Sequence, residues 1–275
     1  MATAGPPGPG WGRRRLLGVL AATVALVAAL LAGLGYLVVD AVHGHAEKAT
    51  LPLGLVEAPT TARERRDAVA AAAMLAVDAA AARGGTPTAH VADPLQVPPA
   101  SAAGQAGVPA GFPHTPAGAV GQLAAIDTTV LTAMSMDTTR AVHQSWALPG
   151  APSVGEWVMT QNVQAFLTAA GSAVTDTAPV PVAVAPVAGQ VKGVDGPDWT
   201  VACVLLRVQV TLARTAAMAY GHCERMAWTG GRWQVAPGTQ PAKAPSTWPG
   251  TDLARKAGWR PWTEATQAGG DGDAQ

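Results

Sequence analysis

Residues 199–212 read WTVACVLLRVQVTL, and this stretch predicts the longest strand of a β-sheet. Val204 and Leu206 alternate with Arg207 and Gln209, the period of two at which successive side chains point to opposite faces of a sheet. A strand with this pattern has one face on the core and the other in water. The C-terminal half of the chain is therefore predicted to fold around a sheet with one covered face.

The segments on either side predict further strands of the same sheet. Residues 178–194, APVPVAVAPVAGQVKGV, also alternate, and their prolines favour an edge position because proline has no N–H to donate. Residues 218–229 predict the next strand, and the Gly-Gly pair at 230–231 predicts a tight hairpin into residues 232–235. The pattern thus indicates about four consecutive antiparallel strands.

Three helices are predicted ahead of the sheet, over residues 116–134, 138–148 and 153–171. Thr115 caps the first helix, and Ser153 with Glu156 forms a capping box at the start of the third. The predicted fold class is α+β, with three helices packed on a curved antiparallel sheet. This folded domain is expected to span residues 114–238.

The register of the central hairpin brings the two cysteines together. If residues 199–212 and 218–229 pair around a turn near Arg214 and Thr215, Cys203 and Cys223 face each other within a residue or two. Cross-strand Cβ atoms lie about 4.5–5.5 Å apart, close to what a disulfide requires. A bulge would shift the register and leave two free thiols. We predict a disulfide, which persists outside the cytoplasm.

Residues 16–39, LLGVLAATVALVAALLAGLGYLVV, predict a transmembrane helix. They contain no charge and no proline, and at about 1.5 Å per residue they span a hydrocarbon core of roughly 30 Å. The arginines at 13–15 predict that residues 1–15 are a cytoplasmic tail and that the rest lies outside. A cleaved signal peptide is the alternative, although its apolar core is usually about 7–15 residues. We predict a single-pass protein of the cell membrane.

Small residues recur every fourth position within this helix, at Ala21, Ala25, Ala29 and Gly33. Such spacing lets two helices pack closely in lipid and would favour a homo-oligomer. Alanine is abundant throughout the chain, so the same spacing also arises by chance.

The remaining segments are predicted to connect and extend the domain. Residues 40–83 are expected to form a juxtamembrane stalk with a helix over 61–83, where Thr61 and Glu64 form a capping box. Residues 84–113 are rich in Pro, Gly and Ala and predict a linker. Residues 239–275 predict a tail whose tryptophans either strap it across the domain or contact a partner: Trp248, Trp259 and Trp262.

Composition limits the chemistry. The chain has 275 residues, zero net charge and 13% charged residues. Direct nucleic-acid binding is not expected, because it requires clustered Lys and Arg. The titratable candidates for a catalytic pocket are three helix residues and two near strand ends: Asp127, Asp137, His143, Asp176 and His222. A carboxylate beside a Tyr or His could abstract a proton, whereas ordinary helix surface is the simpler interpretation of the helix residues.

No cofactor or metal is expected. The sequence has no nucleophile elbow, phosphate loop or dinucleotide fingerprint. His43 and His45 are close enough to share a metal, but no third ligand has suitable spacing around them.

Several segments carry a resemblance to known proteins. The final hairpin, with Trp228, Gly230, Gly231 and Trp233 after three helices, resembles the NTF2-like fold. Four segments of the chain are similar to uncharacterised single-pass proteins of actinobacterial conjugative elements. These segments are residues 111–127, 199–208, 223–238 and 245–259. The plan of anchor and domain also resembles the VirB8 and TcpC components of conjugation and type IV secretion machines.

The resemblance implies an NTF2-like domain outside the membrane that assembles with other channel subunits. Our leading hypothesis is a membrane-anchored, non-enzymatic assembly component of such an apparatus, whose partners are other secretion or conjugation subunits. The alternative is an extracytoplasmic ligand-binding or isomerase-like domain, because fold alone does not give function.

Overall fold

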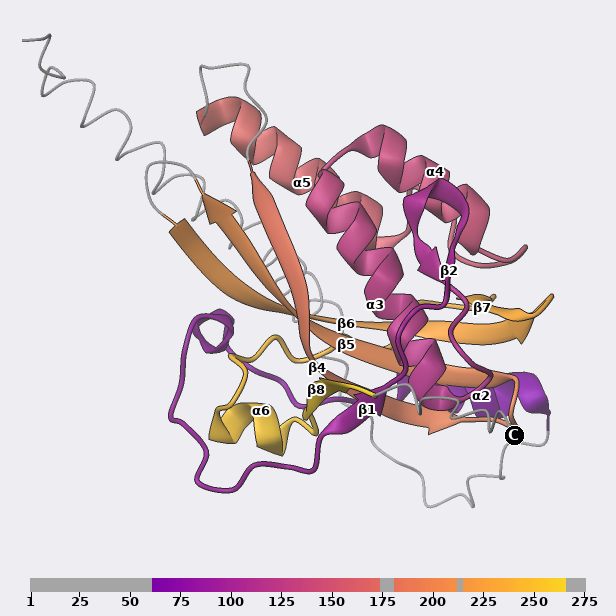
Figure 1. Cartoon of the computed structure of the whole chain (residues 1–275), viewed down its shortest axis with the longest axis horizontal. Coiled ribbons are helices and arrows are strands. Elements are labelled where there is room, and N and C mark those ends of the chain that lie inside the picture. Colours follow the sequence, from indigo (N-terminus) through magenta and orange to yellow (C-terminus); the bar gives the residue numbers. More distant parts are fainter. Residues whose placement is uncertain (1–60, 174–180, 212–214, 266–275) are drawn as a thin grey trace, which may run out of the picture.

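The structure, a computed structural model, describes residues 61–173, 181–211 and 215–265. Within them, six strands form one sheet in the order β1-β8-β4-β5-β6-β7, and β2 pairs with β3 in a separate small sheet. The strands of the larger sheet are β1 Leu95–Val97, β4 Val182–Val194, β5 Trp199–Thr211, β6 Thr215–Thr229, β7 Arg232–Val235 and β8 Arg260–Glu264. Neighbouring strands are antiparallel except β1 and β8, which are parallel. The fold is α+β with a curled, mainly antiparallel sheet (Figure 1).

The expectations for the first sixty residues lie outside the described residues. They concern the cytoplasmic tail, the transmembrane helix and the small residues Ala21, Ala25, Ala29 and Gly33. Among the helices that the structure does describe, none combines the length and the apolar character needed to cross a bilayer.

Helices α3 (Pro116–Ala133), α4 (Met136–Trp146) and α5 (Val158–Ala173) lie together on one side of the sheet (Figure 1). The Thr115 side chain accepts from Gly118 N at the start of α3, as predicted. α5 begins later than the predicted Ser153, because Ser153 and Glu156 bond to each other within a turn that precedes the helix. The three predicted helices are therefore present, with shifted ends.

β5 and β6 form a continuous hairpin whose register is the one expected for the cysteines. Cys203 lies directly opposite Cys223, with their Cα atoms 4.0 Å apart and their sulfurs within disulfide-bonding distance. The edge position predicted for β4 applies to most of the strand, since β8 pairs only with Ala188 and Gly189. Pro186 lies beside a register shift in β4, where a strand tolerates proline.

The sheet is covered on both faces, and the prediction of one covered face for residues 199–212 is wrong for the first part of β5. Even-numbered residues such as Val204 and Leu206 belong to the core cluster beneath α3, while odd-numbered residues such as Val201 and Leu205 belong to a second cluster on the other face. All four side chains are fully buried. A strand buried on both faces has a continuous apolar run, and VACVLL is such a run.

The second face is covered by α2 (Ala62–Ala71), which is shorter than the helix predicted over 61–83. Its capping box at Thr61 and Glu64 is present. Ala70 is fully buried, and its carbonyl accepts from Ala242 N and from Lys192 Nζ. These two donors take the place of the backbone N–H that would donate to the Ala70 carbonyl if the helix continued, and the helix ends at Ala71. Residues 61–71 thus pack on the domain, whereas a stalk was expected.

Residues 84–113, predicted as a linker, contribute to the core instead. They hold β1, the short strands β2 (Ala102–Ala103) and β3 (Pro109–Ala110), and the 3₁₀ turn η2 (Gln105–Gly107); η1 (Ala79–Ala82) precedes them. Val97 and Val108 are fully buried. The apolar residues of this segment are isolated in the sequence and have no periodicity, so the sequence alone does not show that they are buried.

The segment predicted as a C-terminal tail also packs on the second face, through α6 (Asp252–Lys256) and β8. Trp259 is buried, and its Nε1 donates to Pro245 O at 2.9 Å. Trp248 packs against the same cluster beneath Arg207, and Trp262 packs against the helix-side core. These residues therefore strap the segment across the domain, and contact of the half-buried Trp248 and Trp262 with a partner stays a prediction.

Candidate functional site

A group of titratable side chains lies buried between α3 and the sheet. α3 carries Asp127 toward β6, where His222 faces it from the helix side of the strand. Asp127 Oδ2 is 2.8 Å from His222 Nδ1, and the exposed fractions of the two residues are 0% and 4%. Asp127 therefore does not lie on the polar surface of its helix, which was the simpler interpretation of the sequence.

Glu224 extends this group along β6. It is 1% exposed, and its Oε2 is 3.7 Å from His222 Nε2. Trp157 Nε1 and Gln240 Nε2 donate to Oε2 at 3.3 and 3.2 Å, while Arg225 N donates to Oε1 at 3.2 Å. His222 is thus flanked by two buried carboxylates, a set that we name the Asp–His–Glu group (Asp127, His222 and Glu224).

A second polar pair adjoins the group. The ring of Tyr220 stacks with that of His222 at 6.1 Å between centroids, and Asn162 Nδ2 donates to the Tyr220 hydroxyl at 2.7 Å. Within the described residues, Asp127 Oδ1, Asn162 Oδ1 and His222 Nε2 are buried without a hydrogen-bond partner. Buried polar atoms without a hydrogen-bond partner are uncommon in folded proteins. Their presence here makes these residues the candidate functional site.

Burial and mutual interaction shift the proton affinities of the group in one direction. Burial raises the pKa of Asp127 and of Glu224, and His222 opposes both shifts. Burial alone would lower the pKa of His222, but Asp127 and Glu224 outweigh it and raise the pKa. Burial, followed by the charge of Asp127, raises the pKa of Tyr220, so its phenol stays protonated. The group can hold or pass a proton, although its side chains are sealed from solvent.

The other sequence candidates are not part of this group. Asp137 lies exposed in the first turn of α4, where it pairs with Arg140 at 2.6 Å. His143 Nε2 lies 2.8 Å from Pro152 O, and its ring is tilted against Trp157. Asp176, His43 and His45 lie outside the described residues. Within the described chain, no cluster of three or more His, Cys, Asp or Glu side chains could hold a metal ion.

Sequence reasoning missed Tyr220, Asn162 and Glu224. A signal was available for two of them, because residues 220, 222 and 224 share one face of β6 through the strand period of two. For Asn162, no local pattern indicates that α5 faces Tyr220.

Two of the hollows that described residues line open on the outside of the domain. The larger, of about 810 Å³, lies beneath α2, and we name it the α2 cleft. Its lining comprises Arg63, Arg66, Asp67, residues 150–152, Glu156, Trp199, Arg225, Ala227 and residues 236–240. Gln240 connects it with the Asp–His–Glu group, since this side chain both lines the cleft and bonds Glu224.

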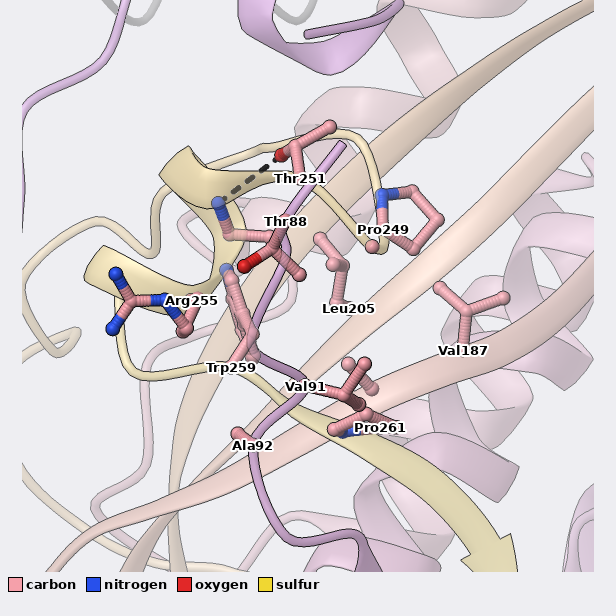
Figure 2. A pocket seen from close by; sticks show the side chains of 13 residues that line it. Thr88, Val91, Ala92, Val187, Leu205, Pro249, Thr251, Arg255, Trp259 and Pro261 are labelled. Carbon is pink, nitrogen blue, oxygen red and sulfur yellow. Dashed lines mark hydrogen bonds between the residues drawn. The ribbon is translucent and has the colours of Figure 1, made fainter. Parts of the chain in front are cut away.

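The smaller hollow, of about 160 Å³, lies between α6, β8 and the second face of the sheet. Figure 2 shows the buried Leu205 and Trp259 together with Val187, Pro249 and Pro261 around it. The one charged residue of the described lining is Arg255, which stands at the side of α6. The hollow is apolar and about as large as one bulky side chain.

Comparison of the chain with protein-family models, with curated proteins and with solved structures finds no match.

Proposed function

We propose that this chain is a single-pass, membrane-anchored assembly component of a conjugation or type IV secretion-like apparatus, with its domain outside the membrane and without catalytic activity. The proposal includes an NTF2-like fold for the domain, in which α3, α4 and α5 pack on the curled sheet of β4 to β7. The resemblance to proteins of actinobacterial conjugative elements and to VirB8 and TcpC components supports this proposal from the sequence side.

The observation that supports a non-catalytic role is the sealing of the Asp–His–Glu group. A catalytic acid or base must come within hydrogen-bond reach of its substrate. Asp127, His222 and Glu224 are 0%, 4% and 1% exposed, and Glu224 Oε2 already accepts hydrogen bonds from Trp157 and Gln240. In this arrangement Asp127 links α3 to β6 through His222, and Trp157, just before α5, links to β6 through Glu224. A buried polar network of this kind can fix the packing of a core in one arrangement.

The cysteine pair supports the location outside the membrane. Cys203 and Cys223 face each other across β5 and β6 at disulfide-bonding distance, and such bonds persist in oxidising compartments. A reporter that is active only outside the cytoplasm should be active when fused after Ala265. Fusion after Gly238 is unsuitable, because residues 239–265 cover the second face. Activity confined to an N-terminal fusion would reverse the orientation.

Co-purification in a mild, uncharged detergent tests the assembly role. The tagged full chain, expressed in its native host, should bring down defined secretion or conjugation subunits, identified by mass spectrometry. A tagged protein that carries only residues 1–60 separates contacts of the anchor from contacts of the domain. Recovery of the full chain alone, without partners and without self-association, would refute the proposal.

The second candidate function is an isomerase-like or ligand-binding domain, and the buried Asp127–His222 pair favours it. Deuterium uptake at the α-carbon of a simple enolisable ketone, such as 3-cyclohexenone in D₂O, measures proton abstraction of the kind that such a pair can perform. Uptake that exceeds the uncatalysed rate and disappears in Asp127→Asn would support this function. Uptake equal in the wild type and in Asp127→Asn would exclude it for this substrate class.

A further inference from the structure

The α2 cleft has the size and the lining of a ligand site. Its volume of about 810 Å³ falls within the roughly 300–1,000 Å³ that is usual for small-molecule sites. Three guanidinium groups converge on it from α2 and β6, those of Arg63, Arg66 and Arg225, and they share it with the carboxylates of Asp67 and Glu156. The described lining therefore carries an excess of positive charge.

Arg225 forms the floor of the cleft. Its side chain is only 3% exposed, and its guanidinium is held by three contacts: Nε to Thr239 O at 2.7 Å, Nη2 to Thr239 Oγ1 at 3.3 Å and Nη1 to Asp67 Oδ1 at 2.7 Å. An arginine has five N–H donors, so two of them have no hydrogen bond among the described residues. The floor is thus a fixed cation with remaining donor capacity.

Gly238 lets the backbone pass close to the Arg225 guanidinium. Its φ is +116°, a conformation that side chains other than glycine rarely adopt. A Cβ at this position would lie 2.6 Å from Arg225 Nη1. A larger residue at this position would therefore displace the guanidinium that lines the cleft.

The other arginines form the wall and the rim. Arg66 lies over the ring of Trp199 with 5.5 Å between its Cζ and the ring centroid, and its Nε pairs with Asp195 at 2.8 Å. The side chain of Arg63 is 92% exposed, and its nearest carboxylate is Asp67 at 3.7 Å. Arg63 is therefore an exposed cation with one long contact to a carboxylate, at the outer edge of the cleft whose buried cation is Arg225.

Asp67 already shows how a carboxylate fits here. It is 45% exposed, lies between Arg63 and Arg225, and makes its short contact with Arg225 Nη1. Planar guanidinium groups recognise carboxylates well because their paired donors match the two oxygens. A second carboxylate entering the cleft would meet the remaining donors of Arg225 and the free side of Arg63.

We propose that the α2 cleft is a binding site for a carboxylate group, with Arg225 as its buried anchor and Arg63 as its outer contact. The carboxylate belongs either to an acidic side chain of an extended protein segment or to a small dicarboxylic acid. The site does not depend on the proposed assembly role, because it follows from the lining of the cleft alone.

Calorimetric titration of the full chain in uncharged detergent micelles tests this site with three probes. They are succinate, the acidic peptide acetyl-Gly-Asp-Gly-Asp-Gly-amide and its neutral counterpart with Asn in place of Asp. At least one acidic probe should bind and the neutral peptide should not. Binding should weaken as salt is raised, because a partly exposed ion pair is screened. Tighter binding of the peptide identifies a protein segment as the source, and tighter binding of succinate identifies a small acid.

Two variants of opposite expected sign make the test specific. Arg63→Gln should weaken the binding of the acidic probe by up to about fivefold, the range of an exposed ion pair. Asp67→Asn should strengthen it, because the internal competitor for Arg225 is removed. Arg255→Gln is the matched control, since Arg255 is also an exposed helix arginine but does not line the cleft. It should bind the probe as the wild type does.

Three results would overturn the proposal: no binding of either acidic probe, equal binding of the acidic and neutral peptides, or an unchanged affinity in both Arg63→Gln and Asp67→Asn. Thermal unfolding of each variant is measured in parallel. Both substitutions replace exposed or half-exposed side chains, so the variants are expected to fold.

Discussion

Raising the pH from 6.5 to 8.0 should destabilise the folded domain, and the cause is the Asp–His–Glu group. Burial raises the pKa of Asp127 and Glu224, and these two carboxylates raise the pKa of His222 against the opposing effect of burial. A group with a raised pKa stabilises the fold fully below its unfolded pKa, and this contribution is lost as the pH rises through its folded pKa. All three groups therefore act with the same sign.

The magnitude follows from the number of protons that the fold retains. In the unfolded chain the carboxylates have released their protons by pH 6.5, whereas the histidine is about half protonated at pH 6.5 and almost fully deprotonated at pH 8.0. The folded group binds these protons more tightly, because the pKa values of all three side chains are raised, and a proton between His222 Nε2 and Glu224 Oε2, 3.7 Å apart, removes the repulsion of two acceptors. One fully retained proton changes the free energy of unfolding by at most about 1.4 kcal/mol per pH unit, so the loss over this interval is up to about 2 kcal/mol.

Urea unfolding of the full chain in uncharged detergent, followed by tryptophan fluorescence at both pH values, measures this difference. Asp127→Asn should flatten the pH dependence, because His222 loses its partner. Asp137→Asn is the control, since that side chain is 92% exposed on a neighbouring helix. Asp195 and Glu156, whose side chains accept hydrogen bonds that lower their pKa, titrate below this interval. Stability that is flat or rises from pH 6.5 to 8.0 would refute the reasoning, as would an unchanged slope in Asp127→Asn.

Three further outcomes are expected. Mass spectrometry of unreduced, alkylated protein should find Cys203 and Cys223 joined, and reduction should lower the free energy of unfolding by about 3 kcal/mol for a loop of this length; two alkylated cysteines would exclude the bond. Gly189→Ala should cost about 1–3 kcal/mol, because its Cβ would lie 2.9 Å from two core methyl groups, whereas Gly84→Ala has open space and should be neutral; equal chemical-denaturation midpoints would contradict this. Trp259→Ala should cost about 3–5 kcal/mol in the same assay, and a loss below about 1 kcal/mol would show that the second face does not depend on it.

The sequence predicts the part of the fold whose local signals agree with its tertiary position. α3 begins where Thr115 and Pro116 place it, and the hairpin of β6 and β7 turns at the Gly-Gly pair, where both φ angles are positive. The register of β5 and β6 follows from the short separation of the two strands in the sequence, because parity fixes which side chains share a face. These features depend on residues close together in the chain.

The features that the sequence does not predict depend on distant partners. Residues 95–97 have too few residues for a periodic pattern, and they form a strand only because β8 pairs with them. α2 ends where Lys192 and Ala242 bond its last turn, a signal that lies far from the helix itself. Asp127 and His222 were each named as candidates, but only the packing of α3 against β6 shows that they form a pair.

The parallel pairing of β1 with β8 has a consequence for the order in which the chain folds. Arg260 Nε donates to Asp93 O beside this pair, across 167 positions of sequence. Contacts this far apart form slowly, because a long loop must close before they contribute. As the chain is made from its N-terminus, β1 has no neighbour in the larger sheet until β8 emerges among the last described residues. A stalled or truncated chain would expose both this strand edge and the apolar second face, and it would be a target for aggregation or proteolysis.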